Sequence, residues 1–174
     1  TDALYLAIRS LDISKGDEII TSPMTWVSST NSITMNNAKP VFVDIKNDLN
    51  IDEKKIENSI TSKTKAILYV NYTGKIADTK KILSIAKKYK LKVIEDSAQS
   101  FGSMRLNKPS GYFGDISCFS FNPMKVLPSL GEAGAVLTNS KKIYQKLKIL
   151  RYAGTVSKEN CVEPSLNFKI DTIQ

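Results

Sequence analysis

The sequence of 174 residues contains no histidine. This absence excludes Ser-His-Asp and Cys-His nucleophile systems, zinc sites that use histidine, and acid–base catalysis by an imidazole. Any chemistry must therefore depend on Lys, Asp, Glu, Tyr or Ser side chains, or on a cofactor. We predict no metal site.

Cysteine and long apolar runs are also scarce. The chain has two cysteines, Cys118 and Cys161, which favours free thiols in a reducing, cytoplasmic compartment over a disulfide framework. No run reaches the roughly 18 apolar residues of a transmembrane helix, so we predict no membrane partner. The chain opens at Thr1 without a basic, apolar leader, which predicts a fragment that begins within a longer protein.

The net charge of +8 raises the question of a nucleic-acid partner. The lysines, however, alternate with Ile, Leu and Tyr in helix-patterned segments such as Asp78–Lys90 and Lys141–Lys148, a pattern typical of a solvated helix face. No basic stripe with interleaved aromatics is visible, so we predict no nucleic-acid binding. An acidic ligand such as a nucleotide or phosphate stays compatible with this charge.

Strand-length apolar runs alternate with helix-patterned segments, which predicts an α/β fold with a mixed, mostly parallel sheet flanked by helices. The length suits a single domain over residues 1–174. The predicted strands are Glu18–Ile20, Pro40–Val43, Lys65–Val70, Lys92–Glu95, Ile116–Phe119 and Gly134–Thr138. The predicted helices are Asp2–Ser10, Val27–Asn36, Asp52–Ser59, Asp78–Tyr89 and Lys141–Ala153.

Three residues that follow strand-like runs are candidate site residues: Trp26, Asp96 and Ser120. Ligands of open α/β sheets bind beyond the carboxyl ends of the strands, so we expect these three to face one crevice. Lys125 lies in the loop just past Ser120, with small residues close behind in Gly131-Glu-Ala-Gly134. An unperturbed lysine has a pKa of about 10.4 and is almost entirely a charged ammonium at neutral pH. Removal of the side chain from water disfavours the charged form and makes the nucleophilic free amine available.

Several motifs occur in order along the chain: Thr1-Asp-Ala-Leu4, Pro23-Met-Thr-Trp26, Pro40-Val-Phe-Val-Asp44, Ile94-Glu-Asp-Ser-Ala-Gln99, Phe119-Ser-Phe-Asn-Pro-Met-Lys125, Gly131-Glu-Ala-Gly134 and Leu166-Asn-Phe-Lys-Ile170. Over its whole length this series resembles the central part of the DegT/DnrJ/EryC1/StrS family of pyridoxal-phosphate-dependent sugar aminotransferases. The resemblance implies the large, cofactor-binding domain of a fold-type I aminotransferase, truncated at both ends and without the small C-terminal domain.

The resemblance also implies the two central residues of the site. Lys125 corresponds to the lysine that binds pyridoxal phosphate covalently and then carries a proton between substrate and cofactor. Asp96 corresponds to the carboxylate that pairs with the pyridine nitrogen and keeps it protonated; taken alone, an aspartate at a strand end would more often cap a helix. Side chains alternate along a strand, so neighbouring Glu95 points the other way and is interpreted as structural.

Other cofactor contacts are implied in the same way. Gln99 matches the residue that bonds the phenolic oxygen, and Trp26 matches the aromatic that stacks on the pyridine ring, although a sole tryptophan could also anchor the core. Ser120 resembles the serine that bonds the phosphate. Thr1 and Asp2 resemble residues at a helix N-terminus, where backbone N–H groups suit an anion.

The segment around Asn167 is similar to one whose asparagine reaches the phosphate of the neighbouring subunit, which implies a homodimer with shared active sites. The alternative is an ordinary turn asparagine. Lys169 stands where relatives often have arginine, and we assign it no role.

The implied function is transfer of an amino group, from an amino acid donor such as glutamate, to a nucleotide-diphosphate-linked keto-sugar of the 4-keto-6-deoxy type, for glycan or lipopolysaccharide biosynthesis. The family's dehydratase branch carries histidine where this chain has Lys125, which favours transamination. Two alternatives stay open: a catalytically silent regulatory relative, or an inactive fragment, that keeps the cofactor site, and an unrelated α/β domain that binds nucleic acid.

Overall fold

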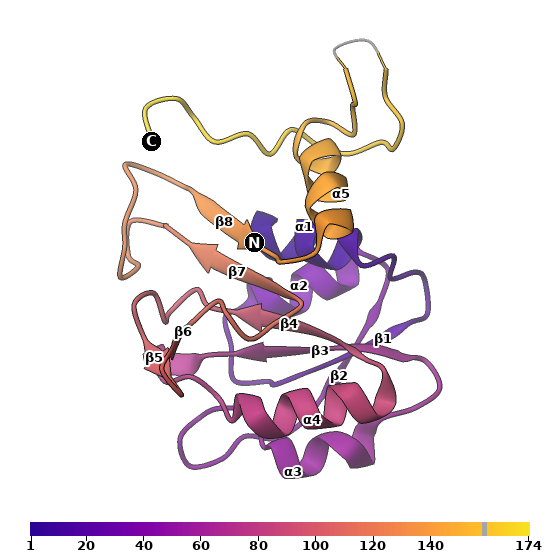
Figure 1. The fold of residues 1–174 in the computed structure, drawn as a ribbon, viewed down its shortest axis with the longest axis vertical. Coiled ribbons are helices and arrows are strands. Elements are labelled where there is room, and N and C mark those ends of the chain that lie inside the picture. The colour runs from indigo at the N-terminus through magenta and orange to yellow at the C-terminus, as the bar shows by residue number, and fades with distance from the viewer. Residues whose placement is uncertain (158–159) are drawn as a thin grey trace.

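The computed structural model describes residues 1–157 and 160–174. Its centre is a six-stranded sheet in the order β2-β1-β3-β4-β7-β8, in which neighbours run parallel except for antiparallel β7 and β8 (Figure 1). The strands are β1 Glu18–Thr21, β2 Lys39–Phe42, β3 Thr64–Val70, β4 Lys92–Asp96, β7 Ile116–Ser120 and β8 Gly134–Leu137. This mixed, mostly parallel sheet confirms the predicted α/β class.

Helices cover both faces of the sheet and make three layers (Figure 1). The helices are α1 Asp2–Ser10, α2 Val27–Met35, α3 Glu53–Ile56, α4 Thr79–Tyr89 and α5 Lys141–Arg151. Buried residues of α1, α2 and α5 join one core cluster, whereas those of α3 and α4 join the other. No helix in the described ranges is both long and apolar enough to cross a bilayer.

Residues 66–70 of strand β3 form an uninterrupted apolar run. Leu68 and Val70 point into the core under α1, α2 and α5, whereas Ile67 and Tyr69 point into the core under α3 and α4. Successive side chains of a strand alternate between faces, so a strand segment covered on both sides is apolar on both faces. The same alternation in β4 sends Glu95 and Asp96 to opposite faces.

The predicted helix starts are confirmed at two aspartates. Asp52 accepts a hydrogen bond from Lys54 N at 3.1 Å and caps α3, and Asp78 accepts one from Lys81 N at 3.4 Å and caps α4. The predicted helix over residues 52–59 is shorter than expected, because α3 tightens into a 3-10 turn, η1, at Glu57–Ser59.

Two small elements were not predicted. A hairpin of β5 Met104–Arg105 and β6 Lys108–Pro109 projects from the connection between β4 and β7, and a 3-10 turn, η2, spans Tyr72–Gly74. Two-residue strands are too short to show a periodic pattern. Both elements lie near the carboxyl ends of the parallel strands (Figure 1).

Candidate active site

The candidate site residues gather at the carboxyl edge of the parallel strands. These strands point to the left in Figure 1, and the loop between β7 and β8 lies at the same side. Trp26 follows β1, Asp96 ends β4 and Ser120 ends β7. The expected grouping at one edge of the sheet is therefore present.

Asp96 is a buried carboxylate, 4% exposed. Its Oδ2 accepts a hydrogen bond from Ser29 Oγ at 2.9 Å, and its Oδ1 accepts one from Ala98 N at 3.1 Å. Among the described residues no Lys or Arg nitrogen lies within 4.0 Å of it. Asp96 does not cap a helix, because its two carboxylate oxygens accept hydrogen bonds from Ala98 N in the following turn and from the Ser29 side chain of α2.

The electrostatics of Asp96 follow from that burial. Burial raises the pKa of the carboxyl above its ordinary value, and the hydrogen bonds from Ala98 and Ser29, with the charge of Lys125, act in the opposite direction. A buried carboxylate without a cation at contact distance is costly. The site is therefore suited to a ligand that brings a positive charge to Asp96.

Lys125 sits in a tightly bonded loop between β7 and β8. Its backbone N donates to Asn122 O at 2.8 Å, and Asn122 Oδ1 accepts from Met124 N at 2.9 Å. The Asn122 side-chain amide also donates to the Glu132 carboxylate across the loop. Lys125 itself is half-buried, and its positive charge acts to lower the pKa of Asp96.

Gly134 allows the chain to return beside β7. A Cβ at this position would lie 2.7 Å from the carbonyl oxygen of Phe119 and 3.8 Å from Ala3 Cβ. The first of these separations is too short for any side chain, so the close approach of β8 to β7 requires glycine. This explains the small residues that follow Lys125 in the sequence.

Gln99 has a fixed side-chain orientation. Its Oε1 accepts a hydrogen bond from Thr73 N at 2.8 Å, within the 3-10 turn at Tyr72–Gly74, where Thr73 has φ 55°. The amide group has one acceptor oxygen and one donor nitrogen, so binding the oxygen to Thr73 directs Nε2 away from it. The Nε2 amide is therefore the group through which Gln99 can donate to a ligand.

The start of α1 lies beside the ends of β7 and β8. Cys118 Sγ donates to Ala3 O at 3.4 Å, and Thr1 Oγ1 lies 2.7 Å from Ser28 Oγ of α2. The first-turn N–H groups of a helix have no intrahelical acceptor, and the Thr1 side chain makes no capping bond to them. The first-turn N–H groups of α1, together with the hydroxyl groups of Thr1 and half-buried Ser120 at the end of β7, are suited to bind an anion.

Trp26 precedes α2 and is 72% exposed. The alternative that it anchors the core is therefore wrong. The Trp26 carbonyl accepts a hydrogen bond from Ser29 N at 3.1 Å. Trp26 and Ser29, which donates to Asp96, therefore lie in the same turn at the start of α2. The ring is free to stack on a ligand at the sheet edge.

Asn167 is the predicted residue that the structure does not bring to this cluster. It lies after α5, is exposed, forms a bridge with Tyr152, and accepts from Lys169 N at 3.3 Å through Oδ1. That bond is typical of a turn asparagine. Its predicted role in a neighbouring subunit stays a prediction.

Glu95 is structural, as interpreted from the sequence. It is fully buried on the face opposite Asp96, and its carboxylate accepts hydrogen bonds from Asn71 Nδ2, Ser110 Oγ, Gly111 N, Phe113 N, Gly114 N and Ser117 Oγ. These donors tie the segment before β7 to the sheet.

We expect Glu95→Gln to lower the free energy of unfolding by about 2–4 kcal/mol, because several buried donors, each worth about 1–3 kcal/mol when left unsatisfied, lose a charged acceptor. The urea midpoint at constant m-value measures this loss. Glu57→Gln, which removes only an exposed ion pair with Lys88, should lower the free energy of unfolding far less than Glu95→Gln. Equal effects of the two variants would contradict the role of Glu95.

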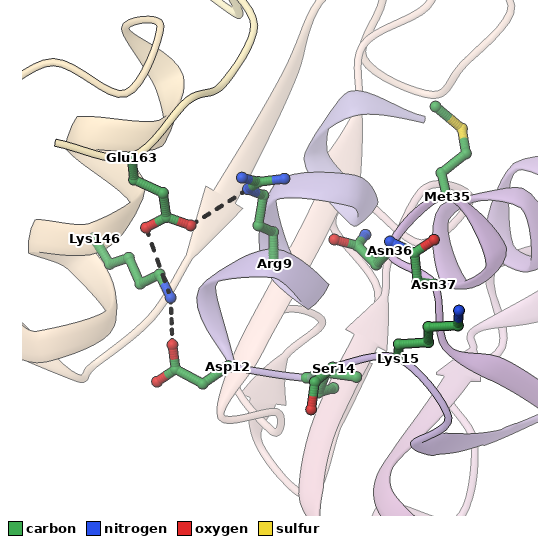
Figure 2. Close-up of a pocket in the computed structure, with 10 residues that line it drawn as sticks. Arg9, Asp12, Ser14, Lys15, Met35, Asn36, Asn37, Lys146 and Glu163 are labelled. Carbon is green, nitrogen blue, oxygen red and sulfur yellow. Dashed lines mark hydrogen bonds and ion pairs between the residues drawn. The ribbon is translucent and has the colours of Figure 1, made fainter. Parts of the chain in front are cut away.

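A hollow drawn in Figure 2 lies apart from this cluster. It is lined by Arg9, Asp12, Lys146 and Glu163, among others, and these four charged groups pair with each other. Arg9 Nε lies 3.5 Å from Glu163 Oε1, and Lys146 contacts both Asp12 and Glu163. These pairs join α1, α5 and the segment after α5, so the hollow is interpreted as structural.

Two site residues were missed from the sequence, Ser29 and Thr73. Ser29 lies in a run of small polar residues, Val27-Ser-Ser-Thr-Asn-Ser, in which nothing distinguishes it. Thr73 contributes only its backbone. The helical spacing from Trp26 to Ser29 was the one available signal, since residues three apart share a helix face.

The sequence is similar to those of known proteins. The chain is 44% identical over 174 residues to a dTDP-3-amino-3,6-dideoxy-alpha-D-galactopyranose transaminase of Aneurinibacillus thermoaerophilus, covering 99% of the chain and 48% of the relative. It is 37% identical to a pleiotropic regulatory protein of Geobacillus stearothermophilus, covering 100% of the chain and 47% of the relative. The chain thus spans about half the length of these relatives.

The crystal structure of NtdA from Bacillus subtilis with bound cofactor PMP superimposes with a TM-score of 0.90 at 35% identity, covering 95% of this chain and 38% of that one. The predicted fold-type I architecture is therefore confirmed. The profile of the DegT/DnrJ/EryC1/StrS aminotransferase family matches residues 1–174. With Lys125, Asp96 and Gln99 at one sheet edge of that fold, this chain belongs to the DegT/DnrJ/EryC1/StrS aminotransferase family.

Proposed function

We propose that the protein is a pyridoxal-phosphate-dependent aminotransferase that moves an amino group from glutamate to a keto-sugar carried on a nucleotide diphosphate. The observation that carries the proposal is the buried Asp96 carboxylate, without a cation at contact distance among the described residues, on the same sheet edge as the half-buried Lys125. Family membership and the named sugar transaminase relative support the same reaction class.

The polar groups of the site fit pyridoxal phosphate. Asp96 offers a negative charge to a protonated pyridine nitrogen, and the Nε2 of Gln99 is directed to donate to an oxygen. The unpaired N–H groups at the start of α1, with Thr1, Asp2 and Ser120 around them, suit a phosphate. Exposed Trp26 offers a flat ring for stacking.

Pyridoxal phosphate, when bound, supplies an aldehyde that takes up amino groups and a ring that accepts electrons. With the cofactor present, Lys125 Nζ would hold it covalently through the aldehyde carbon, a condensation that releases one water. The Lys125 amine, released when an amino donor takes its place, would be positioned to accept the proton from the α-carbon of the donor. Asp96, as a carboxylate, would keep the ring nitrogen of the bound cofactor protonated.

The overall exchange balances without an external oxidant. Glutamate becomes 2-oxoglutarate, and the keto group of the sugar becomes an amine in the second half of the cycle. We propose a 4-keto-6-deoxy sugar as the acceptor and glycan or lipopolysaccharide synthesis as the use of the product. The sugar in the name of the Aneurinibacillus relative carries its amino group on carbon 3, so the test also includes 3-keto sugars.

We further propose that residues 1–174 form the cofactor-binding large domain, that the protein works in the cytoplasm, and that it forms a homodimer with shared sites. The two cysteines are free, which suits a reducing compartment. Asn167 is exposed and therefore accessible to a second subunit. Among the described residues, the apolar side chains of Met124 and Leu130 near the site are more than 80% exposed, as expected of a surface covered by other protein.

The test uses the complete gene product with pyridoxal phosphate, glutamate and a panel of nucleotide-linked 3-keto and 4-keto sugars. We expect glutamate alone to release at most one 2-oxoglutarate per site, and an accepted sugar to allow continuous release, as in a ping-pong reaction. Absence of 2-oxoglutarate from protein that binds the cofactor would overturn the enzymatic function.

A second function is favoured by one relative, the pleiotropic regulatory protein, which matches the full chain. A regulatory protein that retains the cofactor site would show the visible absorbance of bound pyridoxal phosphate but release no 2-oxoglutarate. The same assay therefore separates the two functions, because both predict cofactor binding and only one predicts turnover.

A further inference from the structure

A short chain of hydroxyl groups leads to Asp96 from α2. Ser29 is 1% exposed and donates from Oγ to Asp96 Oδ2 at 2.9 Å. Half-buried Thr25 lies four residues earlier, before the start of α2, and its Oγ1 is 2.8 Å from Ser29 Oγ. The chain Thr25–Ser29–Asp96 therefore runs from the site edge to the buried carboxylate.

The direction of these hydrogen bonds follows from proton counting. An ionised carboxylate only accepts hydrogen bonds, so the single proton of Ser29 is used on Asp96. Ser29 Oγ then has only lone pairs to offer Thr25, and the Thr25 hydroxyl must donate to it. Aligned hydroxyls polarise one another and strengthen the bond to the charged end of the chain.

A protonated Asp96 would disturb this arrangement. A carboxylic acid whose proton lies on Oδ2 is a poor acceptor there and donates instead, so the two hydroxyls would have to reverse direction. Burial alone drives Asp96 towards that neutral form, because a charge is costly in an apolar setting. The two hydroxyls act against burial and favour the ion.

We propose that Ser29, aligned by Thr25, is a positioning residue that holds the Asp96 carboxylate ionised and oriented for the ring nitrogen of the cofactor. This inference rests on the proposed function, because it needs a cofactor with a protonated ring nitrogen. Ser29 itself touches no reacting atom. It acts through Asp96, whose Oδ1 is held separately by Ala98 N.

The test compares Ser29→Ala with Ser32→Ala in the holoenzyme. Ser32 is an ideal match, because it is fully buried in the same helix and donates only to the Ser29 carbonyl, at 2.9 Å. We expect Ser29→Ala to weaken pyridoxal phosphate binding and to lower kcat, each by about tenfold or more, the effect of losing one hydrogen bond to a charged group. The KM for glutamate should change little.

Two further readouts separate positioning from packing. The pH midpoint of the visible absorbance of bound cofactor should shift in Ser29→Ala and stay in place in Ser32→Ala. Ser29→Thr, which keeps the hydroxyl, should recover most of the cofactor affinity. Thr25→Val removes only the outer hydroxyl and should shift the midpoint in the same direction by less, which keeps the test decisive if Ser29→Ala folds poorly.

The outcomes are distinguishable. Equal midpoints, affinities and kcat values in Ser29→Ala and Ser32→Ala, with normal cofactor binding by the wild-type protein, would overturn the positioning role and leave the proposed function intact. A wild-type protein that binds no pyridoxal phosphate would overturn both.

Discussion

Replacement of Lys125 by alanine should abolish the visible absorbance of protein-bound pyridoxal phosphate and lower the rate of transamination by about 10²- to 10⁴-fold, the range typical of a positioned proton-transfer group. The physical reason is that Lys125 is the half-buried lysine whose charge reaches Asp96, in a loop fixed by Asn122. The variant loses both the covalent bond to the cofactor and the base that moves the proton. Absorbance spectra and 2-oxoglutarate release measure the two losses separately.

Two controls accompany this variant. Lys125→Arg keeps the positive charge near Asp96 but has no nucleophilic amine at neutral pH, so it should also lose the absorbance. Lys141→Ala removes an exposed lysine at the start of α5 and should leave absorbance and rate unchanged. An unaltered spectrum in Lys125→Ala would remove Lys125 from its assigned role.

The order of helices and strands was predictable because the spacing of apolar residues along the chain distinguishes helices from strands. The buried part of β3, residues 66–70, is apolar on both faces, and the acidic residues Asp52 and Asp78 mark helix starts by a local interaction. The edge of the sheet where the site lies follows from the parallel arrangement alone. These features depend on residues close together in the sequence.

The contacts that tune the site were not predictable in this way. The bond from Ser29 to Asp96 joins residues 67 positions apart, and that from Thr73 N to Gln99 Oε1 depends on a backbone turn with positive φ. Neither residue type signals its partner. Asn167 needs a second subunit for its predicted role, which no single chain supplies.

Replacement of Asp96 by asparagine should lower kcat by about 10²- to 10³-fold, the size typical of removing one preorganised electrostatic group from an active site. Asparagine keeps the shape but not the charge, so the ring nitrogen is no longer held protonated and accepts electrons poorly. The loss should appear in kcat more than in the KM for glutamate. Ser32→Ala, a buried polar deletion with no contact to Asp96, is the control.

The same variant should be more stable than the wild type when the cofactor is absent, and increasingly so as the pH rises. Burial raises the pKa of Asp96 above its ordinary value of 3.8, so the folded protein binds more protons than the unfolded chain between those two pKa values. Wild-type stability therefore falls relative to Asp96→Asn as pH rises from 3.8 through the raised pKa. Thermal unfolding of both cofactor-free proteins across this window measures the difference. A difference that is independent of pH would show that Asp96 titrates as if it were exposed, which would remove the physical reason for a cation at this carboxylate.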